Sequence, residues 1–252
     1  MREILYGRHA VEETLLAGRR QVFRLMLASG SRLSPSPVLQ QAAEARHIAI
    51  ETLPRPKFDH LTGQVNHQGM AAEVSGYPYS DLEDLWTRRP DASSPILLIL
   101  DCLQDPQNLG GLIRTAEAVG VQGIVLPRHR AVGVTPAVVN ASAGAVEHLR
   151  VALVTNLVQA MEKLQGQGFW LVGLEDEPEA QPYHQARLDT PLALVVGSEG
   201  QGLGRLVKKS CDYLVKIPMT GQITSLNASI AGSIVLYEAW RQRERQQTTD
   251  EH

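Results

Sequence analysis

Short apolar runs alternate with amphipathic stretches along most of this chain. The runs are rich in branched side chains, which is typical of strands buried on both faces of a sheet. In the second part of the chain they lie at 96–100, 123–126, 151–154, 169–174, 192–196 and 213–219. Between them, apolar residues recur at helical spacing, most clearly from Leu109 to Val119. This alternation predicts an α/β fold with a mostly parallel sheet covered on both faces.

The first 75 residues predict a small α/β unit of their own. Helices are expected at 9–17, from Ser34 to about 47 and at 56–61, and strands at 22–27, 48–53 and 69–74. Residues 76–94 predict a linker, because prolines, serines and charges of both signs gather there. The chain is therefore expected to divide into a unit at 1–75, a linker at 76–94 and a larger domain at 95–252.

A glycine-rich loop follows the apolar run at 192–196. Gly197, Gly200, Gly202 and Gly204 would let a ligand approach bare backbone groups. A phosphate cradle is disfavoured, since no Lys-Ser/Thr pair follows and the Glu199 carboxylate would repel a pyrophosphate. The loop suits a ligand that is neutral or cationic at the point of contact. A tight turn between a strand and a helix is the structural alternative.

Composition narrows the classes of function. Hydrophobic residues make up 43% of the chain, which supports a sizeable core, and the net charge of −3 counts against a protein that simply coats nucleic acid. Cys102 and Cys211 lie within or beside apolar runs, as is usual for a reduced cytoplasmic protein. We expect neither export nor membrane insertion, because there is no signal peptide and no apolar run near twenty residues. The eight histidines show no metal-ligand spacing, so no metal site is expected.

Three segments of the second half match a known set of motifs. Gly197–Gly200, Ile217–Met219 and Ser225–Asn227 resemble the second and third motifs of the SPOUT-class RNA 2'-O-ribose methyltransferases. Asn108–Ala116 is similar to the first motif of that family. The resemblance covers roughly residues 95–245, and the ordered motifs make it specific.

The resemblance implies a fold and an activity. The C-terminal part would be an α/β-knot domain, threaded as a deep trefoil knot. The opening segment Tyr6–Glu13 is similar to an N-terminal substrate-binding domain found in part of the family, which is like ribosomal protein L30e. The implied reaction transfers a methyl group from S-adenosylmethionine to a ribose 2'-hydroxyl. Length and the extra domain most resemble the enzymes that methylate a guanosine of 23S ribosomal RNA.

Individual residues take roles from the same resemblance. Those that match catalytic positions are Asn108, Arg114, Glu199, Ser225 and Asn227. Those that match cofactor-binding positions are Leu174, Gly197, Gly200, Ile217, Met219, Ser225 and Leu226.

The charge of Arg114 limits the role that it can take in catalysis. A guanidinium is effectively never deprotonated in proteins, so we favour a clamp on the target phosphate that stabilises the developing alkoxide over a general base. A phosphate oxygen or a water could then take the proton. Glu199 is expected to hold Arg114 or backbone amides, and Ser225 to cap the last long helix.

Two partners are implied, ribosomal RNA and a second copy of the chain. The candidate RNA contacts are Arg19, Arg20, Arg24, Arg128 and Arg130, although clustered arginines often form only a solvated face. The family binds its cofactor beside a dimer interface, so we expect a homodimer through the C-terminal domain. The apolar last helix would suit that interface, or burial within one chain.

Other functions remain open at this stage. Methylation of a guanosine in transfer RNA and antibiotic-resistance methylation of an adenosine in ribosomal RNA are close alternatives. A non-catalytic RNA-binding assembly factor is disfavoured, because all five matched catalytic positions are intact. A nucleotide-dependent oxidoreductase is the alternative from a third class.

Overall fold

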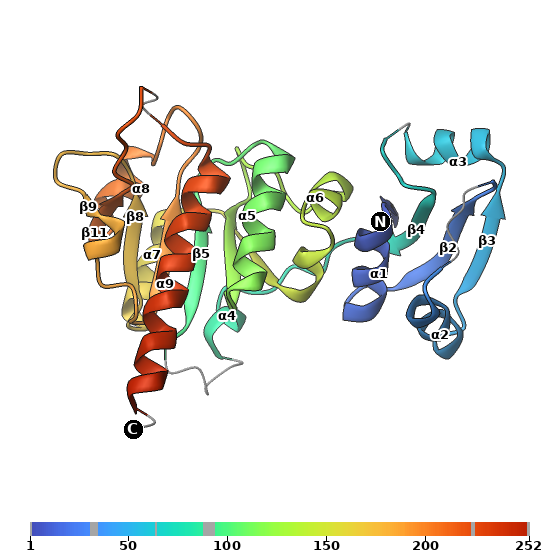
Figure 1. Ribbon diagram of the computed structural model, residues 1–252, viewed down its shortest axis with the longest axis horizontal. Helices are drawn as coiled ribbons and strands as arrows, with labels where there is room; N and C mark the ends of the chain where they lie inside the picture. The colour runs from blue at the N-terminus through green and yellow to red at the C-terminus, as the bar shows by residue number, and fades with distance from the viewer. Residues whose placement is uncertain (1, 31–34, 64, 88–93, 223–224, 251–252) are drawn as a thin grey trace. The chain divides into compact units, whose positions relative to one another are not determined.

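The computed structural model describes residues 2–30, 35–63, 65–87, 94–222 and 225–250, which form two compact units (Figure 1). The first unit comprises residues 1–78 together with 134–148, and the second comprises 79–133 and 149–252. Part of the predicted linker, 88–93, and the predicted helix start at Ser34 lie outside the described residues.

The first unit is built on a four-stranded sheet in the order β1-β4-β2-β3. Strands β2 and β3 pair in parallel, and β4 is antiparallel to both β1 and β2. Its elements are β1 (Arg2–Tyr6), α1 (Arg8–Ala17), β2 (Val22–Ala28), α2 (Pro37–Ala45), β3 (Ala49–Leu53), α3 (Arg55–Thr62), β4 (Met70–Ser75), α6 (Pro136–Ala141) and the short 3-10 helix η1 (Ala145–His148).

Local sequence accounts for the helix ends in this unit. Gly18 is left-handed and ends α1, while the Ser36 side chain accepts a hydrogen bond from the Leu39 backbone N–H at the start of α2. The predicted helices and strands of residues 9–74 are confirmed within a few residues. Strand β1 was not predicted, since its partner β4 lies about seventy residues away.

A segment from the middle of the chain completes the first unit. The side chains of Val138, Val139 and Val146 are fully buried there. The Asn140 amide donates to the Tyr6 carbonyl oxygen at 3.1 Å, so α6 is tied to the end of β1. No local pattern in the sequence distinguishes residues 134–148 from the flanking residues of the second unit.

A buried ion pair joins this segment to the N-terminal part of the unit. The Arg20 Nε atom lies 2.9 Å from Glu147 Oε1, and both side chains are completely enclosed. Arg20 Nη1 also lies 2.7 Å from a carboxylate oxygen of Glu3. Burial raises the pKa of Glu147 despite the nearby arginine charges, and burial raises the pKa of Tyr77, which packs against Arg20, to about 12. The pair therefore depends on both partners being present.

The second unit carries a seven-stranded parallel sheet in the order β7-β6-β5-β10-β8-β11-β9. Its elements are α4 (Asp84–Thr87), β5 (Ile96–Leu100), α5 (Pro106–Ala118), β6 (Gly123–Pro127), β7 (Arg150–Val154), α7 (Leu157–Gly166), β8 (Trp170–Leu174), β9 (Gln181–Pro182), η2 (Tyr183–Gln185), β10 (Leu192–Val196), α8 (Arg205–Lys209), β11 (Tyr213–Lys216) and α9 (Ala228–Asp250). The predicted α/β architecture with a mostly parallel sheet is confirmed.

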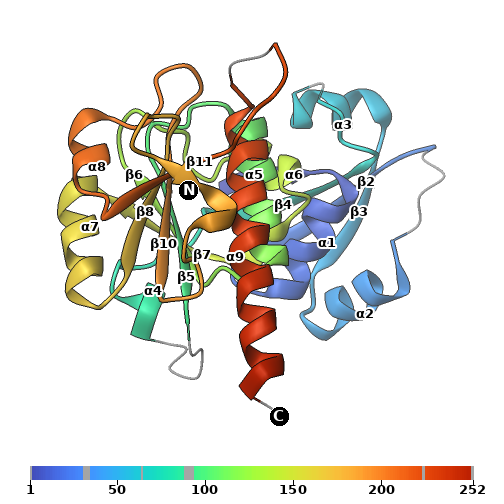
Figure 2. The same ribbon diagram turned by 60° about the vertical axis from the view of Figure 1, so that its left-hand side comes forward.

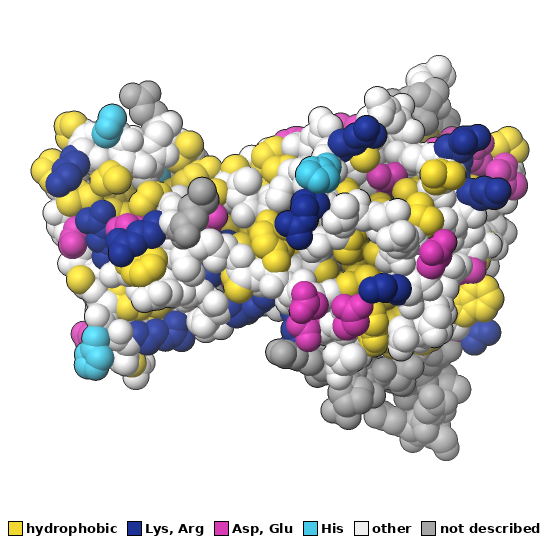
Figure 3. All heavy atoms as spheres, turned by 180° about the vertical axis from the view of Figure 1, so that it is seen from behind, with side chains coloured by type: hydrophobic (Ala, Val, Ile, Leu, Met, Phe, Trp, Pro, Cys, Tyr) yellow, Lys and Arg dark blue, Asp and Glu magenta, His cyan; other side chains and the backbone are white. Residues whose placement is uncertain are grey.

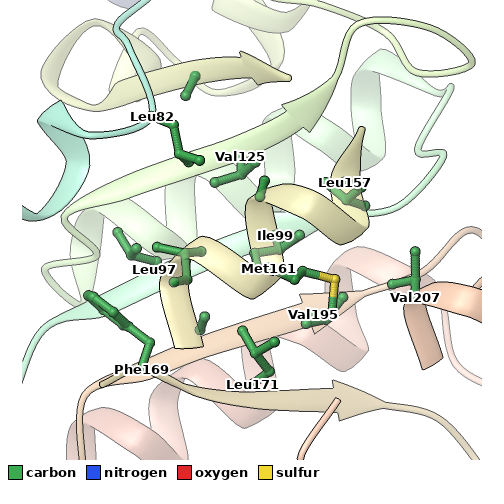
Figure 4. Packing of buried hydrophobic residues seen from close by; sticks show 14 of the residues in the cluster. Leu82, Leu97, Ile99, Val125, Leu157, Met161, Phe169, Leu171, Val195 and Val207 are labelled. Carbon is green, nitrogen blue, oxygen red and sulfur yellow. The ribbon is translucent and has the colours of Figure 1, made fainter. Parts of the chain in front are cut away.

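Helices cover both faces of this sheet. Figure 2 shows α7 and α8 on one side and α5 and α9 on the other. On the α7 side, Met161 and Phe169 pack against Leu97, Ile99 and Val195 (Figure 4). All five residues of β5 and all five of β10 are buried, which explains why these strands are continuously apolar rather than alternating.

Strand β10 lies between β8, which comes shortly before it, and β5, which comes much earlier in the chain. Leu192 pairs with Ile96 on one side and with Trp170 on the other, so the three strands are in register. Their carboxyl ends consequently meet at one edge of the sheet. Among the described residues, no helix is both long and apolar enough to span a membrane.

We expect Arg20→Ala to destabilise the first unit by about 3–5 kcal/mol, because it leaves the Glu147 carboxylate buried without its partner. Urea denaturation followed by circular dichroism measures the loss. Arg24→Ala is the matched control: Arg24 lies 2.7 Å from Glu73 and 3.0 Å from Glu51 but is about one-third exposed, so its loss should cost less than about 1 kcal/mol. Equal losses for the two variants would contradict the assignment.

Candidate functional site

The loop after β10 is held by two carboxylates, one at the end of each strand that pairs with β10. Asp101, which follows β5 and is only 7% exposed, accepts a hydrogen bond from the Gly204 backbone N–H at 2.8 Å. Glu175, which follows β8, accepts from the Leu203 N–H at 2.8 Å. Sequence reasoning missed both residues, although each is an acid directly after a buried apolar run, the signal that would have found them.

Glycine is required at two positions in this loop. A Cβ on Gly197 would overlap the backbone of Gly202 and come within 2.6 Å of the Leu203 nitrogen. Gly202 has a φ of +62°, and its hypothetical Cβ would collide with the Glu175 carboxylate. The glycines therefore let the loop fold tightly against itself and against β8, in addition to baring backbone groups for a ligand.

The loop forms one wall of a cavity of about 240 Å³ at the carboxyl edge of the sheet. The other wall comes from the chain after β11 and the first turns of α9. The cavity is lined by Leu174, Glu175, Asp176, Val196, Gly197, Ser198, Glu199, Gly200, Gly202, Lys216, Ile217, Met219, Ser225, Leu226, Ala228 and Ala231. All seven residues predicted to bind a cofactor are in this lining.

The cavity combines apolar walls with negative charge. Leu174, Ile217 and Leu226 supply apolar surface, while Glu175, Asp176 and Glu199 supply carboxylates. The one lysine in the described lining, Lys216, donates to the Glu177 backbone carbonyl at 3.0 Å. Such a lining favours a ligand that has both an apolar body and positive charge.

A polar cluster joins three of the predicted catalytic residues. Glu199 Oε1 accepts hydrogen bonds from Asn108 Nδ2 at 3.0 Å, from the Ala228 N–H at 3.3 Å and from Asn227 Nδ2. Asn227 Nδ2 also lies 2.7 Å from Asn108 Oδ1. The cluster joins the start of α5, the loop after β10 and the start of α9.

Asn227, rather than Ser225, caps the last helix. Asn227 Oδ1 accepts from the backbone N–H groups of Ser229 at 3.0 Å and of Ile230 at 3.3 Å, and α9 begins at Ala228. The prediction that Ser225 is the cap was wrong. Ser225 lies two residues before the cap, is exposed, and lines the cavity instead.

Arg114 is not part of this cluster in a single chain. It follows Asn108 by six residues on α5, which turns it by about 240° around the helix and shifts it by about 9 Å along the axis. Its side chain is exposed and has no hydrogen-bond or ion-pair partner among the described residues. Of the two roles expected for Glu199, holding a backbone amide is found and holding Arg114 is not.

The five arginines predicted to touch RNA lie in different environments. Arg20 is enclosed in its ion pair, and Arg19 donates to the Tyr77 hydroxyl at 3.1 Å and the Pro78 carbonyl at 3.2 Å, so both stabilise the first unit. An enclosed guanidinium is unavailable to phosphate, and Arg20 is therefore withdrawn as an RNA contact. Arg128 and Arg130 are exposed. On the face drawn in Figure 3, positive side chains are interspersed with Asp and Glu.

Metal binding and catalysis by a cysteine nucleophile are the next two kinds of chemistry to consider. Within the part of the chain that the structure describes, no group of three or more His, Cys, Asp or Glu side chains is placed to hold a metal ion. Burial raises the pKa of the Cys102 thiol and raises that of Cys211 to about 12. Both thiols are therefore protonated at neutral pH and are poor nucleophiles.

Comparison with known proteins identifies the family. The model of the SpoU rRNA methylase family matches residues 95–237, and a model described as RNA 2'-O ribose methyltransferase substrate binding matches residues 4–80. The chain belongs to the SpoU rRNA methylase family. The family predicted from the motifs is thereby confirmed.

Relatives of this SpoU family protein match it over nearly their whole length. YacO of Bacillus subtilis (strain 168), named for the TrmH family of tRNA/rRNA methyltransferases, is 44% identical over 96% of both chains. An AdoMet-bound rRNA methyltransferase from Sinorhizobium meliloti is 25% identical with a TM-score of 0.78, covering 96% of this chain and 87% of that one. The SpoU methyltransferase AviRb from Streptomyces viridochromogenes, at 24% identity and a TM-score of 0.79 over 97% and 91% of the two chains, shows the same fold.

The two cap candidates in this SpoU family protein can be separated by stability. Asn227→Ala should lower the free energy of unfolding of the second unit by about 0.5–2 kcal/mol, because α9 loses its side-chain cap. Ser225→Ala is the control and should have no measurable effect. Thermal and urea unfolding of both variants provide the measurement, and a larger loss for Ser225→Ala would reverse the assignment.

Proposed function

We propose that this SpoU family RNA methyltransferase transfers a methyl group from S-adenosylmethionine to the ribose 2'-hydroxyl of a guanosine in 23S ribosomal RNA, in the cytoplasm. The observation that carries the proposal is one arrangement of residues. A partly apolar cavity with a glycine wall and three carboxylates lies directly beside the Asn108–Glu199–Asn227 cluster.

The cavity fits the cofactor chemically. Backbone groups of Gly197, Gly200, Ile217 and Leu226 would bind the adenosine and methionine parts, and Met219 would supply apolar contact. The carboxylates in the lining attract a sulfonium and an ammonium group, whereas they would repel the pyrophosphate of a dinucleotide. When bound, S-adenosylmethionine supplies an activated methyl group.

The polar cluster would hold the ribose that accepts the methyl group. Glu199 Oε1 takes three hydrogen bonds, while its Oε2 atom accepts none among the described residues. Oε2 is therefore free to accept a hydrogen bond from a hydroxyl group, and the amides that hold Oε1 fix the carboxylate in place. We assign Asn108, Glu199 and Asn227 to positioning the ribose, with Ser225 at the rim of the cavity.

Arg114 requires a second chain if it is to act at this site. Beside it on α5, Gly111 helps line an apolar groove with Ile230, Tyr237 and Trp240 of α9. These three side chains are 53%, 51% and 41% exposed. A second copy seated on this groove would cover the apolar surface and bring another site near Arg114, which could then clamp the target phosphate.

The choice of RNA rests on similarity alone. Transfer RNA and an adenosine of ribosomal RNA remain competing substrates, since the relative from Bacillus subtilis is named for both tRNA and rRNA methylation. The intact polar cluster supports catalysis over a passive assembly role. Mass mapping of ribosomal and transfer RNA from a strain that lacks the gene identifies the nucleotide.

Methyl transfer and cofactor binding can be tested with two opposed variants. Wild type should bind S-adenosylmethionine but not NAD in calorimetry, and should label RNA from the deletion strain. Arg114→Ala should lower methylation by about 10²–10⁴-fold with cofactor affinity unchanged, because it acts on the RNA side. Gly197→Ala should lose cofactor binding, because its Cβ would displace the loop. NAD binding, or no methylation of any RNA by wild type, would contradict the proposal.

We expect the full chain to be a homodimer in sedimentation at micromolar concentration. Trp240→Asp should shift it toward monomer, because a charge would then lie in the apolar groove. Lys163→Asp, at an exposed position on α7 on the opposite side of the sheet, is the control and should leave the dimer intact. A monomeric wild type would exclude the delivery of Arg114 by a second copy.

A further inference from the structure

A second cavity opens on the other side of Glu199. It has a volume of about 340 Å³ and is lined by Cys102, Leu103, Gln104, Asp105, Asn108, Arg130, Ser198, Glu199 and Gln201. Ser198 and Glu199 also line the cofactor cavity, so these two residues form a shared wall. A group held in the second cavity can therefore lie next to a group held in the first.

We propose that this second cavity receives the target nucleotide of the RNA, and that Arg130 binds a phosphate of that nucleotide. The inference rests on the proposed function, since it names where the acceptor of the methyl group is held. Arg130 is a positioning residue here, distinct from Arg114, because it belongs to the same chain as the cavity that it lines.

Arg130 is the group in this cavity that suits an anion. The lining also holds the carboxylates of Asp105 and Glu199, each of which accepts a hydrogen bond from a neighbouring N–H group at 3.0 Å. Arg130 is the one cation in the described lining of the cavity, and its exposed guanidinium has no hydrogen-bond or ion-pair partner among the described residues. A guanidinium without an internal partner can offer a bidentate pair of donors to phosphate. By contrast Arg20 and Arg24 already face carboxylates within the first unit.

The backbone holds Arg130 in place from both sides. The Arg128 N–H donates to the Val154 carbonyl at 2.8 Å, and the Val132 N–H donates to the Leu103 carbonyl at 2.9 Å. Arg130 itself has a φ of +63°, and Cys102 in the same cavity has a φ of +59°, a conformation unusual for residues other than glycine. The turn is thus fixed with Arg130 toward the cavity.

The remaining side chains can read a base and hold a ribose. Gln104 and Gln201 are exposed amides, each with a donor and an acceptor that can pair with a base edge. Asn108 belongs both to the lining of this cavity and to the polar cluster, where its Nδ2 atom lies 3.0 Å from Glu199 Oε1. No aromatic ring is present in the described lining, so recognition here depends on hydrogen bonds and charge rather than stacking.

The test compares Arg130→Gln and Arg130→Lys with Arg205→Gln in the full chain. Arg205 is an exposed arginine at the start of α8 that does not line the cavity and has no assigned part in RNA binding. The probe is ribosomal RNA extracted from the deletion strain. Single-turnover methylation gives kcat/KM, filter binding against salt concentration gives the number of phosphate contacts, and calorimetry gives the affinity for S-adenosylmethionine.

We expect Arg130→Gln to lower kcat/KM by about 10–100-fold and to reduce the slope of log K against log salt by about 0.7–0.9, the loss of one phosphate contact. Cofactor affinity should stay within about twofold, Arg130→Lys should recover part of the rate, and Arg205→Gln should change the rate less than about threefold. Gln104→Ala should lower the rate without changing the salt slope, because it touches the base.

An unchanged salt slope and rate in Arg130→Gln, beside an active wild type, would overturn the assignment of this cavity while leaving the proposed function standing. Equal effects at Arg205 and Arg130 would do the same, since they would indicate general charge attraction. A wild type that methylates no ribosomal or transfer RNA would instead overturn the proposed function. Circular dichroism shows whether each variant is folded. If Arg130→Gln does not fold, the rate and the salt slope of Arg130→Lys are compared with wild type instead.

Discussion

The hydrogen bonds to one carboxylate oxygen, Glu199 Oε1, hold the site together. Its donors come from Asn108, 91 residues earlier in the chain, and from Asn227, 28 residues later. Because one of them also caps α9, the same contacts that shape the site fix where the last helix begins. Loss of this oxygen would leave the Asn108 amide and the Ala228 N–H at the start of α9 without their acceptor, so the site and the local fold depend on each other.

Carboxylates also hold other segments of the molecule in place through hydrogen bonds and ion pairs. Asp101 and Glu175 hold the loop after β10 through backbone N–H groups, which lets a loop rich in glycine keep one conformation. In the first unit, Glu147 ties the segment 134–148 to Arg20. Removal of residues 1–94 would strip that segment of its partner and expose the buried side chains of Val138, Val139 and Val146. Separating the units therefore requires more than one cut in the chain.

The two cavities on either side of Glu199 suggest how a small site can serve two unlike reactants. One has apolar walls and carboxylates, which suit a cationic cofactor. The other adds amides and one guanidinium to the carboxylates of Asp105 and Glu199, and those amides and that guanidinium can bind a nucleotide. Because Ser198 and Glu199 line both cavities, the two binding sites are adjacent. In that arrangement binding can orient both reactants before any bond changes.

The sequence by itself determined the order of strands and helices, the glycine loop and the polar residues at 108, 199 and 227, because local periodicity and motif spacing are properties of short segments. The seven residues matched to cofactor positions line one cavity, and their role in binding the cofactor stays a prediction. Only the tertiary structure decided that β10 lies between β5 and β8, that residues 134–148 pack in the first unit, and that Arg20 is enclosed with Glu147. Each of these depends on contacts between residues far apart in the chain, which no local pattern encodes. The cap at Asn227 instead of Ser225 has a similar cause: the helix begins where the bonds to Glu199 and Asn108 hold the asparagine.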